Sequence, residues 1–120
     1  MGRISSFRQL ETWVQAHELV LMVYQATVDY PADERFGLVS QMRRAAVSIP
    51  ANVAEGFKRR AINDKIRFYN TSEGSLEELK YLVLLSRDLG YIPSGERMTE
   101  RAETVGRLLH GLIASTERRR

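Results

Sequence analysis

The fold is decided by residues 37–56, which read GLVSQMRRAAVSIPANVAEG. The apolar residues of this stretch recur at intervals of three and four, which places them on one side of an α-helix. Pro50 lacks a backbone donor and crowds the preceding turn, but the apolar spacing continues to Phe57. The pattern therefore predicts a helix that begins near Phe36 or Gly37 and is kinked, not broken, at Pro50. Its inner stripe consists of Val39, Met42, Ala46, Ile49 and Val53.

The same spacing predicts three further helices. The first spans residues 12–29, with Trp13 and Tyr24 as core aromatics, and the third spans residues 64–89. The fourth follows residue 94, and serines on the inner face of the third helix indicate a close approach to its neighbours. We expect the first helix to end before Pro31. Asn63 is the expected N-cap of the third helix, and Gly90 is expected to end that helix in the left-handed conformation. Ser94 is the expected N-cap of the fourth helix.

Four helices joined by short connections predict the all-α, antiparallel up-down-up-down four-helix bundle, because no segment alternates in the manner of a strand. The chain has 120 residues, 43% of them hydrophobic and 28% charged, which is typical of a single globular domain. We expect the domain to span residues 1–120, with flexible ends at 1–6 and 116–120.

Membrane and secreted classes are not favoured by the sequence. The longest uninterrupted apolar run, residues 19–24, is far shorter than the ~20 residues of a membrane helix, and residues 1–6 do not resemble a secretory signal. The absence of cysteine excludes disulfides and thiolate metal sites. We expect a cytoplasmic protein that has no membrane partner.

The net charge of +3 is unevenly distributed along the chain. Residues 41–70 carry +5 and the three C-terminal arginines carry +3, while residues 1–40 and 71–117 carry −2 and −3. Such a concentration of positive charge indicates a surface for polyanions, although a solvated helix end and a frayed tail would give the same pattern. The candidate nucleic-acid-binding residues are Arg44, Lys58, Arg59, Arg60, Lys65 and Arg67, with Arg118, Arg119 and Arg120 as further candidates.

A second apolar stripe on each of the first two helices suggests self-association. A bundle helix in a monomer usually has one apolar stripe and a polar back. A wide core face with a few exposed apolar residues is the alternative. The candidate oligomer interface consists of Leu10, Val14, Leu21 and Val28 on the first helix and Arg43, Val47, Ala51 and Ala54 on the second.

Signatures of catalysis or metal binding are incomplete. After His17-Glu18, the position of the second histidine of a zinc-protease helix holds Leu21. His17 and His110 could reach similar heights on adjacent helices, but no cysteine or carboxylate pattern accompanies them. We therefore expect no enzyme, no metal, no cofactor and no small-molecule substrate, unless copies of the chain build a site between them.

The central block, residues 37–56, closely resembles the signature of the 23S rRNA intervening-sequence protein family, also called the four-helix-bundle protein family. Residues 7–24 resemble the first helix of that family, and residues 74–79 and 88–91 resemble its third. The resemblance covers about residues 7–115. The four residues before Gly74 are Asn-Thr-Ser-Glu, whereas members of the family commonly have more apolar or basic residues there. This difference makes the helix more acidic.

The resemblance implies a small bacterial cytoplasmic protein that assembles as a ring-like homopentamer. Some members are encoded within intervening sequences of large-subunit ribosomal RNA genes. A related group is similar to the accessory proteins of diversity-generating retroelements, which are basic pentamers that engage nucleic acid and a reverse transcriptase.

Two hypotheses follow for the function. The first is a non-enzymatic homo-oligomer that binds RNA, or DNA, through phosphate contacts of the basic segment. Base readout is not expected, because no exposed interleaving of aromatic and basic residues is evident. The second is a protein–protein scaffold or assembly factor without a nucleic-acid role. Arg44 is the better candidate for an exposed contact and Arg43 for a salt bridge between protomers, while Asn52 and Glu55 are interpreted as structural.

Overall fold

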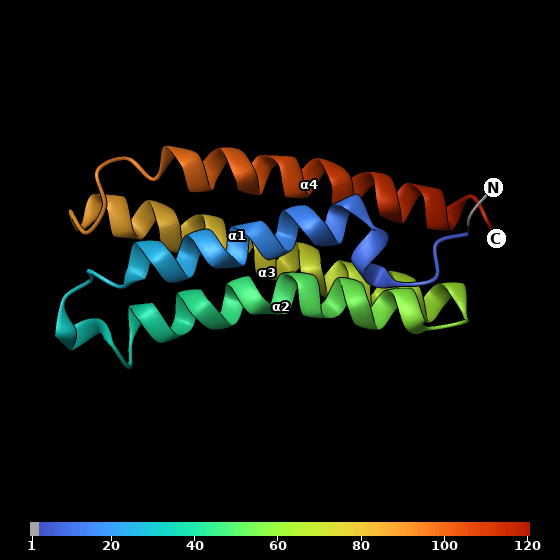
Figure 1. Ribbon diagram of the computed structural model, residues 1–120, viewed down its shortest axis with the longest axis horizontal. Helices are drawn as coiled ribbons and strands as arrows, with labels where there is room; N and C mark the ends of the chain where they lie inside the picture. Colours follow the sequence, from blue (N-terminus) through green and yellow to red (C-terminus); the bar gives the residue numbers. More distant parts are fainter. Residues whose placement is uncertain (1–2) are drawn as a thin grey trace.

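A computed structural model of the protein describes residues 3–120. Successive helices run in opposite directions and pack side by side, and the first also packs against the last (Figure 1). No strand occurs among the described residues. The predicted all-α four-helix bundle is therefore confirmed. Its elements are η1 (Phe7–Gln9), α1 (Glu11–Thr27), η2 (Ala32–Glu34), α2 (Leu38–Lys58), α3 (Ile62–Asp88) and α4 (Glu96–Glu117).

A single hydrophobic core runs between the four helices. Each helix contributes large side chains without solvent exposure, among them Leu19, Met42, Leu79 and Leu109. Burial of each such side chain contributes roughly 1.5–3 kcal/mol, so this core is the main source of stability.

The assignment of Tyr24 to the core is wrong. The core-facing residues of α1 include Leu19 and Val23, whereas Tyr24 is 41% exposed and Trp13 only packs against the edge of the core. Apolar residues point in two directions from this helix, and spacing alone does not say which direction faces inward. Tyr24 follows the buried Val23 by one residue, and the rotation of about 100° between them places Tyr24 at the surface.

Helices α2 and α3 approach each other closely, as the serines on α3 predicted. A Cβ atom at Gly56 would lie 2.6 Å from Cε1 of Tyr69, so this position has no room for a side chain. Ser72 is fully buried and its hydroxyl donates to the Ile49 carbonyl at 2.8 Å. The interface is closed further by a 2.7 Å hydrogen bond between the Ser48 and Ser75 hydroxyls.

The helix boundaries agree with the sequence at some ends and differ at others. Helix α2 continues through Pro50 without a break, and the kink there stays a prediction. The N-cap of α3 is Ala61, so the assignment of Asn63 is wrong. Asn63 lies exposed within the first turn, where water can satisfy the free amides and the Asp64 carboxylate suits the positive end of the helix dipole.

Gly90 ends α3 in the predicted left-handed conformation, with φ of 80°. The Gly90 amide donates to the Arg87 carbonyl and the Tyr91 amide to the Ser86 carbonyl, which is the Schellman arrangement. The N-cap of α4 is Gly95 and not Ser94. A φ of 67° favours glycine at that position, and the Ser94 hydroxyl instead accepts from the Glu96 amide at 3.3 Å.

The bundle measures 47 × 24 × 19 Å and has two distinct ends. One end holds both termini and the α2–α3 connection, and the other holds the α1–α2 and α3–α4 connections (Figure 1). None of the described helices combines the length and apolarity needed to cross a membrane. The flexibility expected at residues 1–6 and 116–120 stays a prediction, and residues 1–2 lie outside the described part.

Candidate nucleic-acid interface

Positive charge collects at the end of the bundle that holds the termini, which we call the basic end. In an even-numbered antiparallel bundle, the C-terminus of α4 returns to the same end as the α2–α3 connection (Figure 1). Three segments are counted as this end, residues 3–11, 55–67 and 117–120. Together they carry ten basic and four acidic side chains, a local net charge of +6. The basic residues are Arg3, Arg8, Lys58, Arg59, Arg60, Lys65, Arg67, Arg118, Arg119 and Arg120, and the acidic ones are Glu11, Glu55, Asp64 and Glu117.

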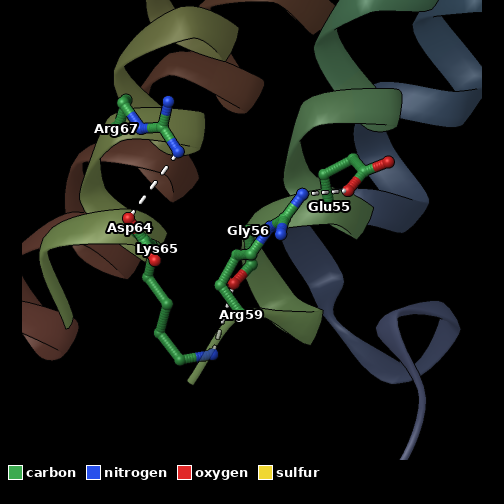
Figure 2. A network of polar contacts seen from close by, with 6 residues as sticks. All are labelled: Glu55, Gly56, Arg59, Asp64, Lys65 and Arg67. Carbon is green, nitrogen blue, oxygen red and sulfur yellow. Dashed lines mark hydrogen bonds and ion pairs between the residues drawn. The ribbon is translucent and has the colours of Figure 1, made fainter. Parts of the chain in front are cut away.

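Lys65 is used to close the corner between α2 and α3. Its ammonium group donates at 2.7 Å to the Phe57 carbonyl, one of those that the end of α2 leaves without helical partners. It also donates at 3.3 Å to the Gly56 carbonyl (Figure 2). The Gly56 carbonyl accepts a second bond from the Arg59 amide. Burial, and then the charge of Arg119, lowers the pKa of Lys65. Of the predicted phosphate-binding residues, Lys65 is therefore the one whose charge is already engaged with the backbone.

Arg59 and Arg67 are held by nearby carboxylates on the protein surface. Arg59 pairs with Glu55 at 3.3 Å and Arg67 with Asp64 at 3.6 Å (Figure 2). Both guanidinium groups also lie over the ring of Phe68, at 4.7 and 5.1 Å from its centre. Exposed ion pairs of this kind contribute about 0–1 kcal/mol, so a phosphate can replace the carboxylate at little cost.

Lys58 and Arg60 are the most available cations of the basic end. Both are exposed, and neither side chain has a hydrogen bond or ion pair with any described residue. Between them, Arg59 begins the extended connection that leads into α3. Neighbouring Tyr69 has a raised pKa because it is buried, an effect that the charge of Arg119 partly opposes. Arg119 therefore lies close enough to add to the field of this surface.

Arg44 lies apart from the other candidates. It is exposed on α2, but at 1.5 Å per residue its position is about 21 Å from Lys58 along the helix axis. The structure thus brings together Lys58, Arg59, Arg60 and Arg67, and separates Arg44 from them. Glu55 and Asn52 lie along the same helix, where Asn52 donates to the Ser48 carbonyl and has a structural role, as interpreted.

Phe68 is a residue of this surface that the sequence analysis did not single out. Its ring is only partly buried, beneath Arg59 and Arg67. Because the Phe68 ring is covered by two guanidinium groups and is not exposed, the expectation that no exposed aromatic and basic residues interleave stays a prediction. The adjacent pair Arg67-Phe68 was the signal in the sequence for an aromatic ring beside a cation. The contact of Arg59 with the same ring could not be predicted from spacing, because it depends on the conformation of the α2–α3 connection.

The candidate interface residues on α1 and α2 include several exposed apolar side chains. Val28 is 70% exposed, and Leu21, Val47 and Ala51 are also exposed. Leu10, Val14 and Ala54 are only partly buried. Each of the two helices thus carries exposed apolar side chains.

Arg43 is engaged within its own protomer. It donates to the Thr27 hydroxyl at 3.0 Å and to the Tyr24 carbonyl at 3.4 Å, and its guanidinium lies 4.5 Å from the centre of the Tyr24 ring. These contacts join α1 to α2.

The two histidines lie in different settings. His17 stacks on Trp13 with ring centres 5.0 Å apart, and His110 lines a groove between α3 and α4. Within residues 3–120, no three histidine or carboxylate side chains converge as metal ligands would.

Comparison with known proteins places the bundle in a family. The profile of the family described as 23S rRNA-intervening sequence protein matches residues 8–111. The chain belongs to this family. The matched region includes the α2–α3 connection, whereas the C-terminal arginines at 118–120 lie outside it. The basic end of this family member therefore combines residues inside and outside the shared region.

A solved structure has a fold similar to that of this chain. It is described as a protein with unknown function from the S23 ribosomal protein family of Bacteroides thetaiotaomicron. The two chains are 21% identical, with a TM-score of 0.75 over 85% of this chain and 97% of the other. At that identity the likeness shows the fold alone. The search of curated proteins found no match to this chain.

Proposed function

We propose that this protein is a non-enzymatic homo-oligomer that binds nucleic acid, foremost RNA, through its basic end. The observation that carries the proposal is the net charge of +6 at one end of the bundle, with Lys58 and Arg60 exposed and unpaired among the described residues. Contacts of lysine and arginine with phosphates are independent of sequence and weaken as salt is raised.

The surface suits a flexible phosphate backbone. Lys58 and Arg60 meet phosphates directly, while Arg59 and Arg67 exchange their carboxylate partners for phosphates. Because each carboxylate pair is exposed and weak, this exchange costs little and adds two guanidinium forks that match phosphate geometry. The contacts carry no base-specific pattern, so binding tolerates many sequences.

Self-association would strengthen such binding. The exposed apolar residues of α1 and α2 support a contact between copies, and the family resemblance implies a ring-like homopentamer. Copies that pack in parallel gather their basic ends on one side, where several modest surfaces engage one strand at once.

The experiment compares two double variants in a titration of a single-stranded RNA and a duplex DNA at low salt. Lys58→Ala/Arg60→Ala removes two cations from the basic end, and Arg87→Ala/Arg107→Ala removes the same charge elsewhere. We expect weaker binding only in the first variant. Equal affinity of the two variants would contradict the site assignment, and no binding by the wild-type protein would contradict the function.

The exposed apolar residues of α1 and α2 also support the alternative of a protein–protein scaffold, since they do not depend on the basic end. A scaffold would be a stable oligomer with negligible affinity for either nucleic acid, and a protein instead of RNA would be recovered with it from cell extract. The same titration, with a mass measurement in solution, separates the two functions.

A further inference from the structure

Phe36 is the most exposed large apolar side chain among the described residues, at 87%. It lies between η2 and α2, in a turn that is fixed on both sides. The Glu34 carboxylate accepts a 2.8 Å hydrogen bond from the Tyr91 hydroxyl and a 3.2 Å bond from the Leu38 amide, and it leaves little space beside Gly37. The ring is therefore presented to solvent by an anchored turn, the arrangement of a preformed interface knob.

A shallow hollow of about 600 Å³ lies over the outer surface of α1. We call it the α1 hollow. It is nearest the end that carries Phe36, because it reaches Val28 at the end of α1 and Arg97 at the start of α4. Its apolar surface comes from residues including Leu21, Tyr24 and Val28, and its cationic rim comes from Arg43, Arg97 and Arg101.

The turn and the hollow are complementary in net charge. The turn carries Asp33, Glu34 and Arg35, a net charge of −1, and the Arg35 guanidinium lies 5.1 Å from the centre of the Phe36 ring. The hollow is lined by three arginines and Glu18, a net charge of +2. Arg97 has no hydrogen bond or ion pair with another described side chain, so it is available to an incoming carboxylate. An aromatic ring beside several guanidinium groups is also a favourable cation–π partner.

We infer that Phe36 of one copy docks in the α1 hollow of a neighbouring copy aligned in parallel. The inference rests on the homo-oligomer of the proposed function and names the contact that builds it. Parallel alignment follows because the knob and the hollow lie at the same end of each bundle, so antiparallel copies would place them at opposite ends.

The contact is heterologous, since the knob and the hollow are different surfaces. Each copy gives its knob to one neighbour and receives a knob from another, and such a contact closes into a ring when the rotation permits. A phenyl ring covers 150–250 Å², too little for a stable interface, so the exposed stripes of α1 and α2 must supply the remaining area. In this ring the basic ends of all copies lie on the same side.

Because the chain has no cysteine, engineered disulfides report this contact without background. Phe36→Cys and Leu21→Cys chains are purified separately, mixed, allowed to exchange and oxidised with diamide. We expect a covalent dimer in the mixture and no cross-link in either variant alone. The Phe36→Cys/Leu21→Cys double variant should give a ladder of covalent species that ends at the size of the native oligomer.

Three results would overturn the inference. A covalent dimer of Phe36→Cys alone would show that the contact is two-fold symmetric. A native oligomer that gives no mixed dimer would refute this contact while leaving the homo-oligomer intact. A wild-type protein that is monomeric by native mass spectrometry at micromolar concentration would refute both the contact and the homo-oligomer.

A variant without cysteine provides an independent readout. Phe36→Ala should raise the concentration at which the oligomer dissociates by at least about tenfold, as expected for an anchoring aromatic residue. Its helical content should be unchanged, because the ring makes no core contact. The matched control is Tyr81→Ala, which removes an aromatic ring that is 59% exposed on α3, outside the proposed contact. An equal effect of the two variants would contradict the role of Phe36.

Discussion

Lys65 and Arg60 lie five positions apart and carry the same charge, yet the fold uses them differently. Lys65 donates to two carbonyls at the end of α2, whereas Arg60 extends into solvent. A count of charges along the chain cannot separate them, because the difference arises from the turn between the helices. At the residue scale, the candidate site divides into cations that hold the corner and cations that remain available to a phosphate.

Replacement of Lys65 should therefore affect stability more than replacement of Arg60. Lys65→Met should lower the free energy of unfolding by about 1 kcal/mol, because the Phe57 carbonyl loses its donor and the Gly56 carbonyl loses one of two. Arg60→Met should change it by less than about 0.5 kcal/mol, as is usual for exposed positions. Urea denaturation followed by circular dichroism measures both values, and equal losses would contradict the capping role.

Glu55 should weaken the affinity of the basic end for RNA, since its carboxylate holds Arg59 and repels phosphate. Glu55→Gln should tighten RNA binding several-fold at low salt, and the effect should diminish as salt screens the charges. Asp29→Asn removes the same charge at the opposite end and serves as the control. An unchanged affinity in Glu55→Gln, measured by the same titration, would show that Arg59 does not contact the strand.

Helices α2 and α3 form the tightest contact of the bundle, and that contact positions the site. Small residues at Gly56, Ser72 and Ser75 let the axes of α2 and α3 approach. Because the two helices are close, a short connection joins them, and the cations of that connection lie together. The serine positions predicted this approach from the sequence. The exact corner was not predictable, because the N-cap of α3 is Ala61, which has no capping side chain to mark the start of the helix in the sequence.

Gly56→Ala should destabilise the protein by roughly 1–3 kcal/mol, because the added methyl group would overlap Tyr69. Gly74→Ala is the matched control, since nothing lies within 4 Å of the new Cβ on α3. That exposed helical position should instead gain about 0.5–1 kcal/mol. The prediction fails if thermal unfolding moves in the same direction for both variants.

The contact between Tyr91 and Glu34 at the opposite end should be sensitive to high pH. The hydrogen bond to Glu34, then burial and the nearby carboxylates, raises the pKa of Tyr91 above its ordinary value of 10.0. The folded protein therefore keeps this proton where the unfolded chain loses it, and the stabilisation is lost as pH rises above about 10. Tyr91→Phe should show a smaller loss of Tm between pH 9 and 11 than the wild-type protein, and identical losses would contradict this.

On the scale of the whole molecule, the bundle is polarised along its 47 Å axis. The even number of helices returns the C-terminal arginines to the end that holds the α2–α3 connection. Composition and topology, both readable from the sequence, suffice to predict this gathering of charge. The place of Phe68 beneath two guanidinium groups and the engagement of Lys65 were not predictable, since both depend on the path of residues 59–61.

The most direct test of the proposed function is the salt dependence of single-stranded RNA binding. Each phosphate contact contributes about 0.7 to the slope of log affinity against log salt for single strands, so Lys58→Ala/Arg60→Ala should lower the slope by about 1.4. The Arg87→Ala/Arg107→Ala control should leave it unchanged. Equal slopes in the two variants, or no measurable binding by the wild-type protein at low salt, would contradict a phosphate-binding basic end.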